Sequence, residues 1–223
     1  RVVDKINIDK TEETETWFKG LDRIYNNFVY DFLYPNPASV LAFIENHDTD
    51  RFLGEGDNLP MLKQASTLLL TTHRIPQLYY GTEVMMNGVK SQSDGYVRKD
   101  FPGGWADGKA TALTAQGRSK MQNDCYNFYK TLLNWRKGND VIAKGSMVQF
   151  MVQNGVYAYA RQYEGKTVFV MLNGTDAETT VPLKFYKEVL KDSKQGKDIL
   201  SGKAITFGEE LKMAPRESLV IEL

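Results

Sequence analysis

The sequence predicts an α/β region followed by an all-β region. An apolar run of strand length, an apolar helix and a second short apolar run follow one another between residues 40 and 80. Near residue 141 the hydrophobic period changes from helical to two, and glycine-containing turns become frequent. Unbroken apolar runs are typical of parallel strands, which are buried on both faces, whereas alternation favours antiparallel ones. We therefore expect an α/β domain over residues 1–140 and an antiparallel β-sandwich over 141–223.

The first elements follow from spacing. Apolar residues recur every three or four positions from residue 17 to 32, which predicts a helix whose buried face contains Trp17, Leu21, Ile24, Phe28 and Phe32. Pro35 should end this helix. A strand is expected over 40–44, a helix from Pro60 to about Thr72, and a second strand over 75–80. We place Tyr79 and Tyr80 in the core.

The rest of the chain divides into a long loop, one more helix and short strands. Residues 81–112 are rich in glycine and polar side chains, so we expect a loop, and loops of this length are often functional. Thr114 is the expected N-cap of a helix that runs past Trp135. Glu164-Gly165 should be the turn of a hairpin. Asn173-Gly174-Thr175 fits a glycosylation acceptor, but we interpret it as a turn.

Composition excludes several classes of function. The 223 residues contain 28 basic and 28 acidic side chains, so the chain lacks the net positive charge expected of a nucleic-acid or anionic-membrane binder. One cysteine allows no internal disulfide, and with two histidines it leaves little for a zinc site. No run approaches the roughly 20 apolar residues of a membrane span. We expect no metal or cofactor in this chain.

The most informative segment is Phe43-Ile44-Glu45-Asn46-His47-Asp48, in which a buried strand runs directly into polar residues. Ligands of α/β proteins bind at the carboxyl ends of parallel strands, because the following loops converge there. Two interpretations fit. Asn46 and Asp48 form a turn with His47 buried as a satisfied core residue, or the three side chains face a ligand.

These motifs resemble those of the α-amylase superfamily, glycoside hydrolase family 13. Residues 43–48 resemble the family's fourth conserved region at the end of its seventh barrel strand, and residues 75–83 resemble its eighth-strand motif. Residues 94–105 resemble the next loop of neopullulanases and cyclomaltodextrinases, and the β-rich end resembles the family's C-terminal domain. The resemblance covers about residues 15–223 and implies the C-terminal part of a (β/α)8 TIM barrel followed by an antiparallel β-sandwich domain.

The resemblance also implies site residues. Asp48 matches the third catalytic carboxylate and His47 the neighbouring transition-state histidine, which hydrogen-bond sugar hydroxyls as charge develops. Asp94 and Arg98 match positions that hold donor-side sugars, with a surface ion pair as the alternative interpretation. Asn46 and Trp105 complete the expected substrate-binding set. Trp105 either stacks on a sugar ring or packs under the glycines of its own loop. Arg51 either orients the loop that carries Asp48 or is a solvated side chain, and we expect the second.

Other family motifs have no match here. No segment resembles those that carry the nucleophile aspartate and the acid glutamate, and a complete barrel takes roughly 250 residues. The chain starts at Arg1 without an initiator methionine or a signal peptide, so we expect a C-terminal fragment that is inactive alone. Its parent would be a retaining enzyme cleaving α-1,4 links in pullulan, cyclodextrin, maltodextrin or starch. Calcium ligands, where the family has them, would lie in the missing portion.

Other functions fit the sequence less well. A His-Asp phosphohydrolase needs more histidines than His73 alone, and a calcium loop from Asp48 fails at Phe52 and Leu53. The serious rival is a non-catalytic carbohydrate-binding or assembly module. Expected partners are an α-glucan oligosaccharide and the missing N-terminal half or a second copy, not nucleic acid or membrane. The lack of disulfides suits cytoplasm or periplasm, and the resemblance to glycan-utilising bacterial enzymes favours periplasm.

Overall fold

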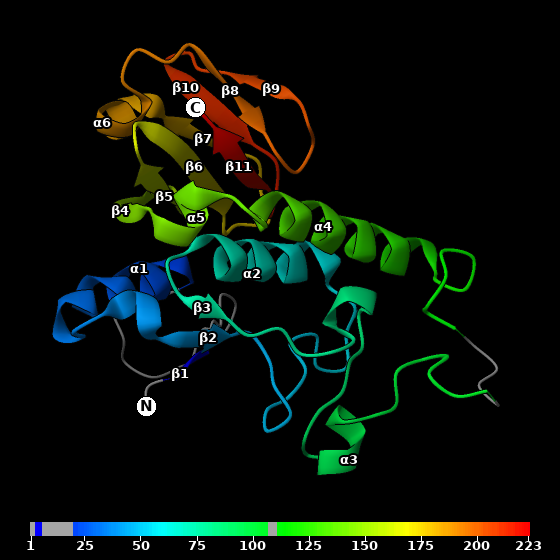
Figure 1. Ribbon diagram of the computed structural model, residues 1–223. Helices are drawn as coiled ribbons and strands as arrows, with labels where there is room; N and C mark the ends of the chain where they lie inside the picture. Colours follow the sequence, from blue (N-terminus) through cyan, green and yellow to red (C-terminus); the bar gives the residue numbers. More distant parts are fainter. Residues whose placement is uncertain (1–2, 6–19, 107–110) are drawn as a thin grey trace.

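The computed structural model describes residues 3–5, 20–106 and 111–223. Figure 1 shows an α/β region with long loops on one side, the antiparallel strands on the other, and helices α2 and α4 running between them. The elements in chain order are β1 (Val3–Lys5), α1 (Leu21–Val29), η1 (Tyr30–Leu33), η2 (Pro37–Ser39), β2 (Leu41–Phe43), α2 (Leu59–Thr71), β3 (Ile75–Pro76), η3 (Thr82–Val84), α3 (Asp94–Val97), α4 (Lys120–Arg136), α5 (Asp140–Lys144), β4 (Ser146–Gln153), β5 (Val156–Tyr163), β6 (Lys166–Asn173), β7 (Thr179–Pro182), η4 (Leu183–Tyr186), α6 (Lys187–Leu190), β8 (Gln195–Asp198), β9 (Ala204–Thr206), β10 (Glu210–Met213) and β11 (Ser218–Glu222).

The predicted β-α-β unit is present. Strand β2 lies between β1 and β3 and pairs with both in parallel. The connecting helix α2 begins where expected: Asn58 caps it by accepting a hydrogen bond from the Met61 amide at 3.1 Å, with Pro60 in its first turn. Helix α2 is buried on nearly all sides, including at the polar residues Gln64, Ser66 and Thr67, because other elements cover it from both directions.

The second strand is shorter than predicted. Regular pairing ends at Pro76, and the Gln77 amide makes one further bond to the Ala42 carbonyl at 2.8 Å. The chain then turns away at Gly81, whose φ of 81° lies in the left-handed region. Tyr79 is therefore only partly buried and Tyr80 is exposed, so the prediction that both lie in the core was wrong.

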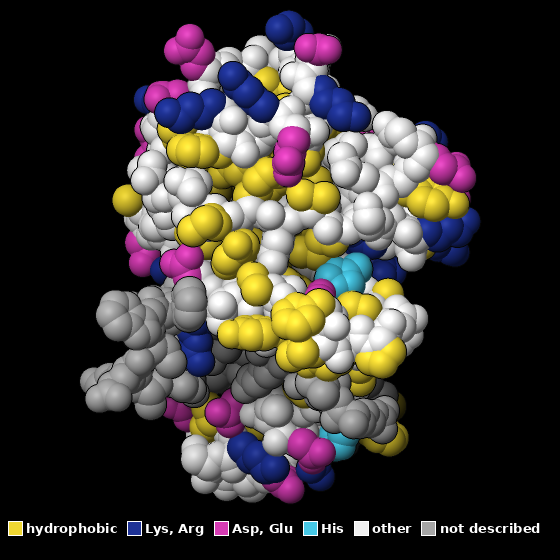
Figure 2. All heavy atoms as spheres, turned by 90° about the vertical axis from the view of Figure 1, so that its left-hand side faces the viewer, with side chains coloured by type: hydrophobic (Ala, Val, Ile, Leu, Met, Phe, Trp, Pro, Cys, Tyr) yellow, Lys and Arg dark blue, Asp and Glu magenta, His cyan; other side chains and the backbone are white. Residues whose placement is uncertain are grey.

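Helix α1 is also shorter than its apolar pattern. Leu21, Ile24 and Phe28 are buried as expected, whereas Trp17 lies outside the described residues. After Val29 the chain tightens into the 3₁₀ helix η1, and the changed residue spacing leaves Phe32 77% exposed instead of buried. Figure 2 shows apolar side chains gathered on this side of the molecule; the large exposed ones on α1 and η1 are Val29, Tyr30, Phe32 and Leu33.

Helix α4 starts five residues later than Thr114 would place it. Ser119 is its N-cap in a reciprocal capping box with Gln122: the Gln122 amide donates to the Ser119 hydroxyl at 3.2 Å, and the Ser119 amide donates to the Gln122 side chain at 2.9 Å. Thr114 instead caps a separate turn by accepting a hydrogen bond from the Gly117 amide. Both caps satisfy orphan amides, but only Ser119 leads into a long helix.

The C-terminal region is mostly antiparallel sheet. Six strands pair in the order β4-β5-β6-β11-β8-β9, and β7 pairs with β10 in a second, two-stranded sheet. The predicted hairpin turn joins β5 to β6, with Glu164 and Gly165 both at positive φ, as a type I′ turn requires. Strand pairing starts at Ser146, because residues 140–144 form the short helix α5.

The two regions share one core. Leu68 of α2, Leu132 of α4 and Val170 of β6 belong to the same buried apolar cluster. Arg161 of β5 adds a polar joint: its guanidinium donates to the carbonyls of Thr71 at 3.0 Å and Gly145 at 2.7 Å. Burial lowers the pKa of Arg161 to about 10. A second buried apolar cluster lies between the other face of the large sheet and the layer formed by the two-stranded sheet and α6.

Candidate active site

The backbone after β2 forms a turn that presents His47 and Asp48 to solvent. Ile44 and Glu45 are the last buried residues of this segment. The Asn46 side-chain oxygen then accepts a hydrogen bond from the Asp48 amide at 2.8 Å, and the Asn46 amide donates to the Thr49 hydroxyl at 3.1 Å. This is an Asx turn, which aspartate and asparagine form readily after a strand. Asn46 thus shapes the turn.

His47 is not the buried core residue that one interpretation required. Its side chain is 58% exposed and that of Asp48 is 61% exposed. The His47 Nε2 and an Asp48 carboxylate oxygen lie 3.2 Å apart. The pair therefore faces outward at the carboxyl end of β2, where its donor and acceptor atoms can reach a ligand.

Arg98 joins this pair to Asp94. Its Nη2 lies 3.1 Å from one Asp48 oxygen and 3.4 Å from an Asp94 oxygen, while its Nε donates to the His47 carbonyl at 2.9 Å. Asp94 starts the short helix α3 and Arg98 follows its end, so that the four-residue spacing brings both side chains to one face. The structure thus brings together His47, Asp48, Asp94 and Arg98, which we call the ion-pair cluster.

Lys90 is a fifth member that the sequence did not point to. Its Nζ lies 3.4 Å from an Asp94 oxygen and donates to the Asp48 carbonyl at 3.2 Å. Its backbone amide also donates to the Asp50 carboxylate, which fixes the loop next to the turn. A lone lysine in a polar loop carries no distinctive pattern, so only the folded arrangement identifies it.

The charges of the ion-pair cluster balance. The carboxylates of Asp48 and Asp94 face the cations Lys90 and Arg98, and all four side chains are at least 40% exposed. Exposed pairs of this kind contribute about 0–1 kcal/mol each to stability, so the fold does not depend on them. Charged donors and acceptors at one exposed rim are, however, well suited to bracket the hydroxyls of a sugar.

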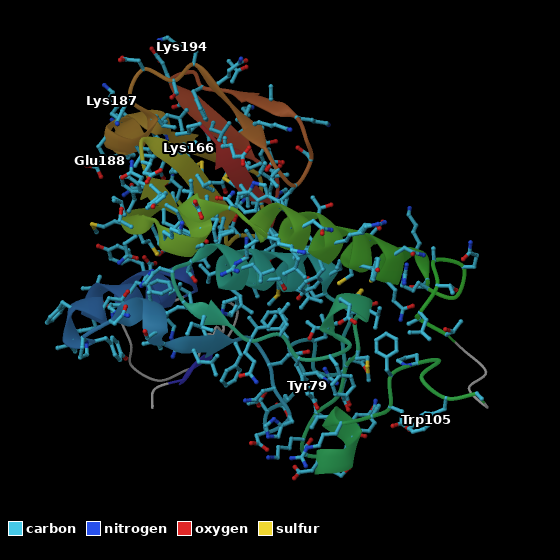
Figure 3. All side chains as sticks on the ribbon, viewed as in Figure 1. Tyr79, Trp105, Lys166, Lys187, Glu188 and Lys194 are labelled. Carbon is cyan, nitrogen blue, oxygen red and sulfur yellow. The ribbon has the colours of Figure 1, made fainter. Side chains whose placement is uncertain are left out.

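Trp105 does not join the ion-pair cluster. It lies on an outlying stretch of the long loop, well apart from Tyr79 in Figure 3, and it is 66% exposed. The charged residues Lys166, Lys187 and Lys194, labelled in the same figure, lie still farther away on the antiparallel domain. The six predicted site residues therefore separate into four in the ion-pair cluster, Asn46 in its turn, and Trp105 apart.

Arg51 was expected to be solvated, but it is buried with only 1% of its surface exposed. Its Nη1 lies 3.1 Å from an oxygen of Glu45, which is itself buried at the end of β2. A glutamate directly after the buried apolar run was the available signal, because a buried carboxylate needs a charged or donating partner. We did not use it.

Two further features concern the part of the chain that the structure describes. Within it, no group of three or more histidine, cysteine, aspartate or glutamate side chains is arranged to hold a metal ion. In the same residues, no helix has the length and apolarity needed to cross a bilayer.

Comparisons with known proteins agree with this architecture. A model of the cyclo-malto-dextrinase C-terminal domain matches residues 147–222. An α-amylase of Niallia circulans is 31% identical over 197 residues, covering 85% of this chain and 32% of the relative. A cyclomaltodextrin glucanotransferase of Thermoanaerobacterium thermosulfurigenes is 30% identical over 212 residues, covering 92% of this chain and 26% of the relative. The chain thus spans about a third or less of these relatives.

A solved structure shows the same fold. The α-amylase of Geobacillus thermoleovorans, in complex with acarbose, superposes with a TM-score of 0.70 at 23% identity, covering 91% of this chain and 43% of that one. The antiparallel region corresponds to the C-terminal domain of such amylases. The chain belongs to the α-amylase family, glycoside hydrolase family 13.

Proposed function

We propose that this chain is the C-terminal part of a retaining glycoside hydrolase that cleaves α-1,4-glucosidic bonds in α-glucans. The observation that carries the proposal is the ion-pair cluster, in which His47, Asp48, Asp94 and Arg98 meet at the exposed carboxyl end of β2. Family membership supports it, because the similar proteins are named as an α-amylase and cyclomaltodextrin glucanotransferases. In this proposal β1–β3 belong to a (β/α)8 barrel whose other strands lie outside this chain.

Each residue of the ion-pair cluster has a role in the proposed reaction. The His47 imidazole N–H and the Asp48 carboxylate would hydrogen-bond hydroxyls of the glucose unit at the cleaved bond, where positive charge develops in the oxocarbenium-like transition state. The negative charge of Asp48 would also favour the protonated form of a nearby acid. Asp94 and Arg98 would bracket hydroxyls of the donor-side sugar. Other segments of the protein would supply the nucleophile and the acid/base.

Transfer to a second sugar is the other candidate outcome. Several relatives are cyclomaltodextrin glucanotransferases by name, at about the same identity as the α-amylase. A retaining mechanism accommodates both, since the covalent intermediate is released either by water or by a sugar hydroxyl. Product analysis with starch, pullulan and cyclodextrin would separate hydrolysis from transfer and define the preferred α-glucan.

Asp48→Asn in the complete protein that contains this chain tests the proposal. This change keeps the shape of the side chain but removes its charge, so we expect kcat on a maltooligosaccharide to fall about 100- to 1,000-fold or more. The melting temperature should stay unchanged, because the side chain is exposed. Asp57→Asn is the matched control, since Asp57 is exposed in the following loop outside the ion-pair cluster.

Two results would contradict the proposal. Near-normal turnover by Asp48→Asn would remove that residue from catalysis. Binding of α-glucans by a wild-type protein that cleaves none of them would instead support the rival function, a non-catalytic carbohydrate-binding module. Intact-mass measurement and N-terminal sequencing of the purified natural protein would show in addition whether segments with the other catalytic groups accompany this chain.

A further inference from the structure

The buried guanidinium of Arg51 contacts three separate segments. Its Nη1 donates to the Glu45 carboxylate at 3.1 Å and to the Tyr80 carbonyl at 2.6 Å, and its Nε donates to the Val97 carbonyl at 3.0 Å. Glu45 comes directly before Asn46 in the turn after β2, Tyr80 lies in the segment after β3, and Val97 comes directly before Arg98. One side chain thus links the segments that carry both halves of the ion-pair cluster.

Glu45 extends these links. One of its oxygens also accepts from the Thr82 hydroxyl at the start of η3, and the other accepts from the backbone amide of Phe52. The Arg51 backbone amide in turn donates to the Gly88 carbonyl at 2.9 Å. The buried pair Glu45 and Arg51 therefore connects the turn after β2 to several points of the segment from Tyr80 to Val97.

Two aromatic rings pack against the guanidinium. Its central carbon lies 4.0 Å from the centre of the Tyr79 ring and 4.9 Å from that of Tyr80. The Tyr80 hydroxyl donates to the Lys99 carbonyl at 2.6 Å, next to Arg98. Only the planar, forked arginine side chain can stack on rings and donate in several fixed directions at once, which a lysine ammonium cannot reproduce.

We infer that Arg51, held by Glu45, is a positioning residue for the ion-pair cluster. It sets the turn carrying His47 and Asp48 against the segment formed by α3, which starts at Asp94, and Arg98, which follows the helix, so that both parts can contact one sugar chain. Stability alone does not require this arrangement, since buried ion pairs are often replaced by apolar side chains without loss. The inference rests on the proposed function, because it assumes that the ion-pair cluster acts on a glucan.

The test compares Glu45→Gln/Arg51→Met with Arg51→Lys in the complete protein that contains this chain. The double variant removes both buried charges and retains side-chain volume, so its melting temperature should stay within about 4 °C of wild type. Its kcat should nevertheless fall about 100-fold, by more than KM rises, because a displacement near 1 Å in a catalytic group has an effect of that size. Arg51→Lys keeps a positive charge beside Glu45 but loses the forked guanidinium, so its kcat should also stay below that of wild type.

Arg118→Met is the matched control. Arg118 also donates to a backbone carbonyl, that of Ala112 at 2.9 Å, and stacks on Tyr126 at 3.9 Å, but it lies outside the ion-pair cluster. Its variant should keep wild-type kcat and KM.

Asp48→Asn, measured in the same assay, distinguishes failure of the positioning role from failure of the proposed function. If Asp48→Asn inactivates while the double variant or Arg51→Lys keeps wild-type kcat, Arg51 is only structural and the proposed function stands. If Asp48→Asn itself is fully active, the proposed function fails, and the positioning role fails with it. Loss of kcat in both Arg51 variants, with the double variant folded and Arg118→Met normal, supports the inference.

Discussion

The antiparallel domain and the loops that follow β2 and β3 keep their shape by different interactions. In the domain, eight-residue strands pair along their full length, and Val156, Phe169 and Ile221 are completely buried between its sheets. The loops have almost no strand pairing. Their backbone is held instead by buried polar side chains that reach across it, above all Glu45 and Arg51.

This difference places the residues that stabilise the fold and the proposed ligand contacts in different regions. A paired and apolar region gains its stability from burial and tolerates little change inside, whereas loops on such a scaffold are free to carry exposed polar groups. The ion-pair cluster lies wholly in the loops, and its side chains are exposed. Substitutions in the two regions should therefore separate loss of folding from loss of function.

Phe169→Ala should have the largest effect on folding. The Phe169 ring is fully buried and lies 5.3 Å from the Tyr186 ring, centre to centre. Its removal leaves a cavity between the sheets, which should lower the free energy of unfolding by about 3–5 kcal/mol. Urea denaturation of the chain measures this. Phe185→Ala is the control, because Phe185 is 44% exposed and its loss should change stability by about 0.5 kcal/mol or less.

Arg98→Gln should show the opposite behaviour. Its exposed ion pairs contribute little, so the free energy of unfolding should change by less than about 1 kcal/mol. Loss of charged hydrogen bonds to a sugar should weaken binding of a maltooligosaccharide to the complete protein about 10- to 100-fold, as titration calorimetry would show. Lys144→Gln removes an exposed pair with Asp140 elsewhere and should not alter binding. If Arg98→Gln and Lys144→Gln bound the maltooligosaccharide with equal affinity, Arg98 would not contact the sugar.

The smallest effect is expected at the Asp176–Arg216 pair in the antiparallel domain. Arg216 donates to both Asp176 oxygens, at 2.7 and 3.0 Å, and these hydrogen bonds lower the pKa of Asp176 below its usual 3.8. The lowered pKa means that the pair stabilises the fold fully above pH 3.8 and loses its effect as the pH falls through the folded-state pKa. Asp176→Asn should therefore be slightly less stable than wild type at neutral pH.

Thermal unfolding as a function of pH tests this sign. The difference in melting temperature between wild type and Asp176→Asn should shrink below pH 4. A difference that grows in acid would mean that the pair does not act as the geometry indicates.

Sequence periodicity predicted the elements whose structure is determined by residues close to them in the chain. The β-α-β unit, the hairpin at Glu164-Gly165 and the antiparallel end follow from apolar runs and turn residues, and all three are present. Errors arose where a local pattern had two solutions. Thr114 and Ser119 are both good caps, and only Ser119 has a glutamine three residues later to complete the box. Phe32 fits the helical face, but the chain tightens before reaching it.

The candidate site could be predicted only where its residues are adjacent in sequence. His47-Asp48 after a buried strand and the Asp94/Arg98 spacing were visible, whereas their contact across 50 residues depends on how the loops fold. The contacts of Lys90 with Asp48 and Asp94 likewise depend on how the loops fold. Arg51 was misjudged because an arginine is usually exposed, and only its contacts with Glu45 and distant backbone carbonyls show why this one is not.

A crystal structure of the complete protein carrying Asp48→Asn, with a bound maltooligosaccharide, tests the role of the ion-pair cluster most directly. One glucose unit should lie with its hydroxyls within hydrogen-bonding distance of the His47 imidazole and of the side chain at position 48, and the next unit should contact Asp94 and Arg98. A sugar chain that binds elsewhere and leaves these four side chains in water would contradict the assignment.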